Sequence, residues 1–125
     1  IVPLMAMLRT RATLPAPIRA TAPATLLYSS RGWDDVIYRD EVIALADDPG
    51  VNVVQTLTRS QPSGWTGFTR RIDADMLAEV APAPSLRPNI YICGPTALVE
   101  TAAQILVELG HEPARVKTER FGPTG

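Results

Sequence analysis

Cys93, Gly94 and Pro95 are the residues whose types and order point most directly to chemistry. They follow the apolar run Ile90–Ile92 and precede a long amphipathic segment, so we expect a strand that ends in a tight turn and leads into a helix. In open parallel sheets, ligands bind outside the carboxyl ends of the strands. A thiol there could pack beside a ligand or act as a nucleophile, whereas most free cysteines are simply small buried side chains.

Nucleophilic and metal chemistry lack the other residues that they need. His111, the single histidine, follows Gly110 after a predicted helix, where we expect a solvated corner. No serine, aspartate or second histidine is placed to complete a triad or a metal site with it. A cysteine-nucleophile hydrolase is therefore the least favoured function, and we predict no metal.

The composition fits one domain covering residues 1–125. The chain is 46% hydrophobic and 20% charged, and its net charge of −1 argues against a nucleic-acid groove or a polybasic membrane patch. One cysteine cannot form an internal disulfide and fits a reducing compartment, so we expect a cytoplasmic protein. No run of about 18 apolar residues could span a bilayer. We expect neither nucleic acid nor membrane as a partner.

Helix-like and strand-like segments alternate along the chain. The predicted order is helix 2–10, loop 13–23, strand 25–29, helix 36–46, strand 51–58, a short helix after 73, a strand from 89, helix 98–109 and an edge strand 115–121. Asp34 or Asp35 would cap the second helix and Asp73 the third. The alternation predicts an α/β fold with a doubly wound, mostly parallel sheet.

The last predicted helix has the clearest periodicity. Its apolar residues fall four, three and four positions apart, at Leu98, Ala102, Ile105 and Leu109. That spacing places them on one face, which we expect to be buried. Gly110 follows at the position of a helix C-cap.

Four further segments carry motifs in a fixed order. They are Ile1–Met5, Leu26–Arg31, Ile90–Pro95 and Glu119–Gly122. Together they resemble the pyridine-nucleotide-binding domain of the ferredoxin–NADP reductase superfamily, over nearly the whole chain. The resemblance implies that the carboxyl edge of the sheet binds NAD(P)H, which passes a hydride to FAD held by a preceding β-barrel domain.

The resemblance assigns a role to each motif residue at the nicotinamide end. Cys93 matches the family cysteine beside the nicotinamide, and Gly94 and Pro95 match the turn that lets the cofactor approach the backbone closely. Thr58 and Arg59 match a position on the nicotinamide-ribose side of the cleft.

The adenosine end is expected at the first visible strand. Ser30 and Arg31 stand where the family contacts the adenosine ribose, and a hydroxyl with a guanidinium favours the 2′-phosphate of NADPH over the free 2′-hydroxyl of NADH. Tyr38 would stack on adenine. Arg39 would make a second basic contact, although a solvated helix face explains it equally well.

Two aromatic residues also match positions in the family. Trp65, in the long loop 59–67, matches a lid over the cofactor or anchors that loop on the sheet edge. Phe121 resembles a terminal segment that approaches the flavin in some branches. The chain continues to Gly125, unlike branches that end in an aromatic residue.

The resemblance also implies an N-terminally incomplete domain. The family's glycine-rich strand and phosphate loop precede the segment that matches Ile1–Pro3, and Pro3, in the first turn of a helix, retains part of the phosphate-binding capacity. The implied missing strand is the central one, between strands 25–29 and 89–93. We expect a chain that is poorly stable and inactive alone, or one in which those two strands pair directly.

The sequence therefore predicts the NADPH-binding half of a flavin-dependent oxidoreductase. Its FAD would be held mainly by a flavin-binding domain upstream, and electrons would pass to a ferredoxin-like iron–sulfur or haem acceptor. The alternative is a non-catalytic nucleotide-binding or interaction module that keeps the fold without the flavin domain.

Overall fold

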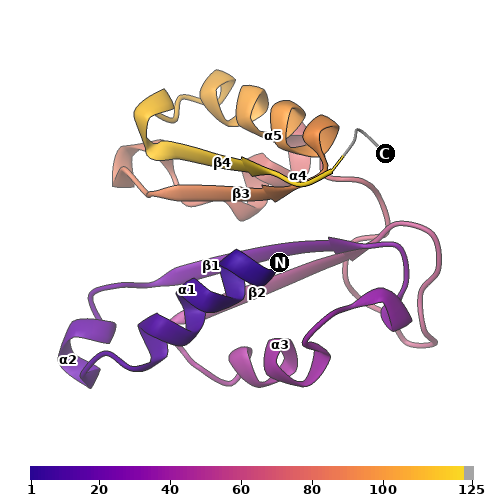
Figure 1. The fold of residues 1–125 in the computed structure, drawn as a ribbon, viewed down its shortest axis with the longest axis horizontal. Helices are drawn as coiled ribbons and strands as arrows, with labels where there is room; N and C mark the ends of the chain where they lie inside the picture. Colours follow the sequence, from indigo (N-terminus) through magenta and orange to yellow (C-terminus); the bar gives the residue numbers. More distant parts are fainter. Residues whose placement is uncertain (123–125) are drawn as a thin grey trace. The chain divides into compact units, whose positions relative to one another are not determined.

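The computed structural model describes residues 1–122, which form two compact units (Figure 1). The N-unit comprises Met5–Arg71, and the C-unit comprises the chain from Ile72 onward together with Ile1–Leu4. Helix α1 (Val2–Ala12) begins in the C-unit residues and continues in the N-unit. Residues 123–125 lie outside the described part. They belong to the segment after Phe121 that distinguishes this chain from family branches ending in an aromatic residue.

The N-unit is built on two parallel strands, β1 (Ala24–Ser30) and β2 (Val51–Leu57). Their register runs from Ala24 opposite Val51 to Ser30 opposite Leu57. The strands are rich in β-branched and aliphatic residues, and the side chains of Leu26 and Leu57 are buried in the core. Since parallel strands end at the same edge, the segments that follow them are neighbours.

The helices of the N-unit differ in two places from the prediction. A short helix, α2 (Ala16–Arg19), with proline in its first turn, lies within the predicted loop 13–23. The predicted helix 36–46 begins only at Arg39, as α3 (Arg39–Leu45), because Tyr38 at its N-cap has a left-handed backbone with φ of 57°.

The late start of α3 has a tertiary cause. The backbone N–H of Ile37 donates to the Tyr28 hydroxyl at 3.0 Å, and the side chain of Val36 is buried. These contacts hold the chain away from helical geometry. Asp34 and Asp35 belong instead to a separate 3₁₀ turn, η1 (Trp33–Asp35), so the predicted cap of α3 by an aspartate is wrong.

The C-unit also has two parallel strands, β3 (Ile90–Gly94) and β4 (Val116–Arg120). Helix α5 (Thr96–Glu108) packs on both strands, and α4 (Ala74–Val80) packs on α5. The predicted cap of α4 is confirmed, because the Asp73 carboxylate accepts the backbone N–H of Met76 at 2.9 Å. Two 3₁₀ turns, η2 (Pro84–Leu86) and η3 (Pro113–Arg115), precede the strands.

The buried face of α5 only partly matches the predicted stripe. Of the predicted residues Ala102 is buried and Leu98 and Ile105 are half-buried, but Leu109 is 37% exposed, and the most buried residues are Val99 and Leu106. The helix carries two adjacent apolar rows, and the packing on β3, β4 and α4 selects the row that contains Val99 and Leu106.

The predicted solvated corner at His111 is also wrong, because His111 is only 5% exposed. Gly110 adopts a φ of 107°, which turns the chain inward, and the His111 backbone N–H donates to the carbonyl of Leu106 at 3.1 Å.

In each unit, the side chain of one arginine forms hydrogen bonds near the start of both strands. In the N-unit, Arg11 donates to the Ala22 carbonyl at 2.6 Å, before β1, and to the Asp48 carboxylate at 3.1 Å, before β2. In the C-unit, Arg115, just before β4, donates to the Asn89 side chain at 3.2 Å, just before β3. We call Arg11 and Arg115 the entry arginines.

The alternation of helices with parallel strands confirms the α/β class. Within residues 1–122 the strands form two separate pairs, β1–β2 and β3–β4, so the expected direct pairing of strands 25–29 and 89–93 is not formed. No helix in this part of the chain has the length and apolar character needed to cross a membrane.

Candidate functional site

The carboxyl edge of the N-unit sheet gathers four of the predicted site residues. Ser30 ends β1, and its carbonyl accepts the backbone N–H of Thr58 at 2.9 Å. The carbonyl of Arg31 accepts the backbone N–H of Arg59 at 2.8 Å. We call Ser30, Arg31, Thr58 and Arg59 the N-rim. Its backbone bonds place two guanidinium-bearing residues side by side, whereas the resemblance assigned Arg31 to the adenosine ribose and Arg59 to the nicotinamide-ribose side.

The side chains of the N-rim are available to a ligand. Arg31 and Arg59 are exposed, and within residues 1–122 neither guanidinium has a hydrogen bond or ion pair to the protein. A Cβ on Gly32 would lie 2.5 Å from the Ser60 hydroxyl oxygen, so the turn after Arg31 runs close against the loop that follows β2.

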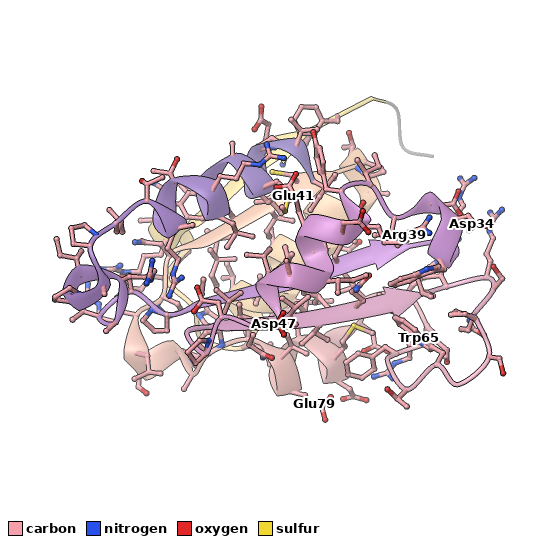
Figure 2. All side chains as sticks on the ribbon, turned by 90° about the horizontal axis from the view of Figure 1, so that it is seen from below. Asp34, Arg39, Glu41, Asp47, Trp65 and Glu79 are labelled. Carbon is pink, nitrogen blue, oxygen red and sulfur yellow. The ribbon has the colours of Figure 1, made fainter. Side chains whose placement is uncertain are left out.

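An aromatic cluster lies in the loops beyond the N-rim. The rings of Trp33 and Trp65 are tilted, with centroids 6.0 Å apart, and the Arg39 guanidinium lies 5.3 Å from the centre of the Trp33 ring. One Arg39 nitrogen is 3.8 Å from the exposed Asp34 carboxylate, whereas its buried Nε has no hydrogen-bond partner among the described residues. Figure 2 labels Asp34, Arg39 and Trp65 in this region.

Trp65 anchors its loop. Its indole N–H donates to the Phe68 carbonyl at 3.0 Å, and Phe68 bridges to Thr56 of β2. A Cβ on Gly67 would come within 2.6 Å of the Trp65 ring, which explains the glycine. This geometry fits the loop anchor, and the expectation of a lid over the cofactor stays a prediction.

Tyr38 borders an open cleft of about 390 Å³ that Val36, Arg39, Asp40 and Glu41 also line. The Arg9 guanidinium covers one face of the Tyr38 ring at 4.9 Å from its centre. Arg9 also binds Glu41 through two hydrogen bonds of 2.6 and 2.9 Å, which raise the pKa of Arg9 and lower that of Glu41. A ligand could therefore stack only on the other face of Tyr38.

The carboxyl edge of the C-unit sheet gathers a different set, which we call the C-rim: Cys93, Gly94, Pro95 and Phe121. The Gly94 carbonyl accepts the backbone N–H of Phe121 at 2.9 Å. Gly94 has a φ of 152°, and a Cβ there would lie 3.1 Å from the Leu98 side chain. Pro95 is the N-cap residue of α5. The C-rim thus has the tight strand-to-helix turn predicted from the sequence.

The Cys93 thiol is suited to packing rather than nucleophilic attack. Burial raises its pKa, and the Glu119 carboxylate, directly opposite in β4, raises it further. A thiol with a raised pKa stays protonated near neutral pH, and only the thiolate is a strong nucleophile. The electrostatics therefore disfavour the hydrolase alternative.

The remaining predicted residue, Pro3, lies in the first turn of α1. The sequence analysis did not single out Trp33. Its place in the sequence between Arg31 and Arg39 was the one signal that could have pointed to its contact with the Arg39 guanidinium. In residues 1–122 no group of three or more histidine, cysteine, aspartate or glutamate side chains is arranged to hold a metal ion.

Comparison with solved structures supports the fold. The cytochrome b5 reductase domain of Ulva prolifera nitrate reductase superposes with a TM-score of 0.77 at 22% identity, covering 94% of this chain and 45% of that one. The Amycolatopsis cytochrome P450 reductase gives a TM-score of 0.69 at 23% identity, covering 98% of this chain and 35% of that one.

Comparison with curated sequences and family models identifies the family. NADH-cytochrome b5 reductase 1 of Emericella nidulans is 32% identical over 96 residues, which are 76% of this chain and 31% of that protein. The same enzyme of Mortierella alpina is 30% identical over 79 residues, covering 63% and 26%. The chain thus spans about a third or less of the length of these relatives. The oxidoreductase NAD-binding domain model matches residues 1–104. The resemblance drawn from the motifs is confirmed, and the chain belongs to the oxidoreductase NAD-binding domain family.

Proposed function

We propose that this chain is the NADPH-binding half of a flavin-dependent oxidoreductase. The enzyme takes a hydride from NADPH onto FAD and passes the electrons to an iron–sulfur or haem acceptor. Membership of the NAD-binding family supports nucleotide binding, and the matched relatives are named as reductases of cytochrome b5. The FAD is held mainly by a flavin-binding domain outside these residues.

The observation that carries the proposal is the pair of N-rim guanidinium groups, which have no hydrogen bond or ion pair to any other residue of the part of the chain that the structure describes. Arg31 and Arg59 are joined through their backbones at 2.8 Å, and Ser30 adds a hydroxyl beside them. Guanidinium groups bind phosphate oxygens through paired hydrogen bonds, and a hydroxyl can donate one more. This donor set fits the 2′-phosphate of NADPH, with the cleft at Tyr38 and Arg39 for the adenine.

The C-rim fits the uncharged nicotinamide. Bound NADPH supplies the hydride, and the flavin accepts it. Cys93 holds a protonated, polarizable thiol at the strand end, and the Gly94–Pro95 turn lets a ring approach the backbone. These residues position and shield the ring rather than react with it.

NADH is the second candidate cofactor, because the matched relatives are named as NADH enzymes. A carboxylate at the end of β1 would favour the free 2′-hydroxyl of NADH. Here that position holds Ser30 and Arg31, and the nearby Asp34 lies 3.8 Å from Arg39. The N-rim therefore favours NADPH.

The choice between NADPH and NADH can be tested with two cofactor fragments that lack the nicotinamide. Isothermal titration of the chain with adenosine 2′,5′-bisphosphate and with AMP should show tighter binding of the bisphosphate. Arg31→Gln should weaken the bisphosphate by about 10- to 100-fold and leave AMP unchanged, because a hydrogen bond to a charged group contributes about 1.5–3 kcal/mol.

Arg19→Gln is the matched control, since it removes the same charge at α2, before the amino end of β1. It should leave the affinity for both ligands unchanged. Equal affinity of the original chain for the two ligands, or equal losses in Arg31→Gln, would refute the NADPH assignment and leave NADH.

The catalytic half of the proposal requires the flavin partner. Ferricyanide reduction by NADPH and FAD should be absent with the chain alone. It should appear when a family flavin-binding domain, followed by the family's glycine-rich strand and phosphate loop, is fused before Ile1. If the fusion binds FAD and nucleotide but reduces no ferricyanide, the chain is the non-catalytic module instead.

A further inference from the structure

A small cavity lies in the C-unit at the edge of the sheet opposite the C-rim. It has a volume of about 120 Å³ and is bounded by Leu77 and Ala78 of α4, the turn 81–84, Leu109 and His111. Leu109 ends α5, and α5 runs antiparallel to β3, so this cavity adjoins the amino ends of the strands. The nucleotide site proposed above is at their carboxyl ends.

Apolar atoms form most of the cavity wall. Leu77 is buried in the core, and Pro84 lies within 3.7 Å of the position of a Cβ on Gly110. The left-handed backbone of Gly110 thus brings the end of α5 against the turn 81–84. A cavity of about 150 Å³ lined by apolar side chains holds a benzene molecule, so a single ring is the right size class here.

His111 gives this apolar cavity one polar group. The residue is 5% exposed and lines the cavity, and within residues 1–122 its ring has no hydrogen bond or ion pair to the protein. Its ring nitrogens are not among the buried atoms that lack a partner in the described residues, so they remain accessible through the open side of the cavity. A neutral imidazole has one donor and one acceptor nitrogen, so it can bond a hydroxyl group.

We propose that this cavity binds a single-ring phenol, with the ring against Leu77, Leu109 and the turn 81–84 and the hydroxyl hydrogen-bonded to the His111 imidazole. The apolar wall selects a ring and the imidazole selects its hydroxyl. A purely aliphatic ligand would leave the imidazole without a partner, and a charged ligand would have to lose its hydration in an apolar cavity. The site is independent of the nucleotide and goes beyond the proposed function.

The probe is phenol, with benzene as the ligand that lacks the hydroxyl. His111 is the only histidine, so its ring signals in a long-range ¹H–¹⁵N NMR spectrum need no assignment. Phenol should shift these signals saturably, with a dissociation constant on the order of 1 mM, as expected for a ligand of so few atoms. Benzene should bind about tenfold more weakly, the factor that one net hydrogen bond contributes.

Two variants separate the cavity from the hydrogen bond. Ala81→Leu fills the cavity and should abolish phenol binding, whereas Ala46→Leu, at the equivalent position after α3, should leave it unchanged. His111→Phe keeps a ring but removes the polar group, so phenol and benzene should bind equally in saturation-transfer spectra.

Three results would overturn the proposal. The first is that the His111 signals do not shift at a phenol concentration tenfold above the expected dissociation constant. The second is equal affinity of the original chain for phenol and benzene, and the third is an equal loss of phenol affinity in Ala81→Leu and Ala46→Leu. A water molecule in the cavity, with no ligand selectivity, would give the first of these results.

Discussion

The N-unit and the C-unit share a plan of two parallel strands but differ at both edges of the sheet. At the carboxyl edge, the N-rim presents the exposed Arg31 and Arg59, whereas the C-rim presents a protonated thiol and a Gly-Pro turn. At the amino edge, the side chain of entry arginine Arg11 is 10% exposed, whereas that of Arg115 is 29% exposed.

The difference shows how one strand arrangement serves two kinds of ligand chemistry. Parallel strands bring the residues that follow them to one edge whatever those residues are. Charged side chains at that edge suit phosphate, and small neutral ones suit an uncharged ring. The ligand chemistry proposed for each rim therefore depends on side chains at the strand ends and not on the strands themselves.

The largest expected effects on stability come from substitutions in the hydrophobic cores of the N-unit and the C-unit. They test whether the two cores are equally well packed. Leu57 and Met76 are both 0% exposed, one in each unit. Replacing either with alanine should lower the stability of its own unit by about 2–5 kcal/mol, from lost burial and the cavity left behind. Amide hydrogen exchange of β2 for Leu57→Ala, and of α4 and α5 for Met76→Ala, measures the two losses.

Exposed residues provide the matched controls. Ile43→Ala in the N-unit and Leu86→Ala in the C-unit replace side chains that are 50% and 74% exposed. Each should change the exchange rates far less than the core substitution in the same unit. A core substitution no more harmful than its control would show that the unit concerned lacks a close-packed core.

The sequence was sufficient for features that depend on near neighbours. The four strands follow from short β-prone runs, and the Asp73 cap follows from a residue three positions before its partner. Each of these inferences needs only a local pattern. The closeness of Arg31 and Arg59 was not predicted, because the resemblance assigned the two residues to different ends of the cofactor.

Features fixed by distant contacts could not be predicted. The start of α3 depends on the bond between Tyr28 and Ile37, and the burial of His111 depends on how α5 packs. The Trp33 contacts with Arg39 and Trp65 join two separate loops, and no periodicity in the sequence signals them.

The entry arginines should differ in their contribution to stability. Arg11 is mostly buried and donates to the Ala22 carbonyl and to Asp48, so Arg11→Met leaves half-buried acceptors without these donors. We expect a loss of about 1.5–3 kcal/mol in urea unfolding. Arg115→Met should cost less, because water can replace its bonds at a more exposed site.

Lysine substitutions sharpen this test. Arg11→Lys retains the charge but cannot reach the separate acceptors with a fork of donors, so it should recover little stability. Arg115→Lys should recover most of the small loss. Equal losses in the two methionine variants would show that the amino edges are equivalent after all.

The smallest expected effects concern Asp48 and Glu112, the carboxylates near the amino edge of each sheet. Their contributions to stability should respond differently to salt. The Gly50 backbone N–H, followed by Arg11, lowers the pKa of Asp48, whereas Arg87, followed by Arg115, lowers the pKa of Glu112. A lowered pKa in the folded state stabilises the fold above the ordinary carboxyl pKa of about 4, and this contribution is lost as the pH falls through the lowered value.

Stability should therefore fall below about pH 4, and both Asp48→Asn and Glu112→Gln should flatten that fall. In Asp48→Asn, Glu112 and its ion pairs remain, and high salt should flatten the loss of stability at low pH further because salt screens exposed charges. In Glu112→Gln, Asp48 remains and accepts the Gly50 backbone N–H at 2.9 Å, so high salt should change the loss of stability less. Urea unfolding at a series of pH values, with and without salt, measures both slopes. An identical salt response in the two variants would mean that ion pairs hold both edges in the same way, and the contrast between the units would then be confined to the N-rim and the C-rim.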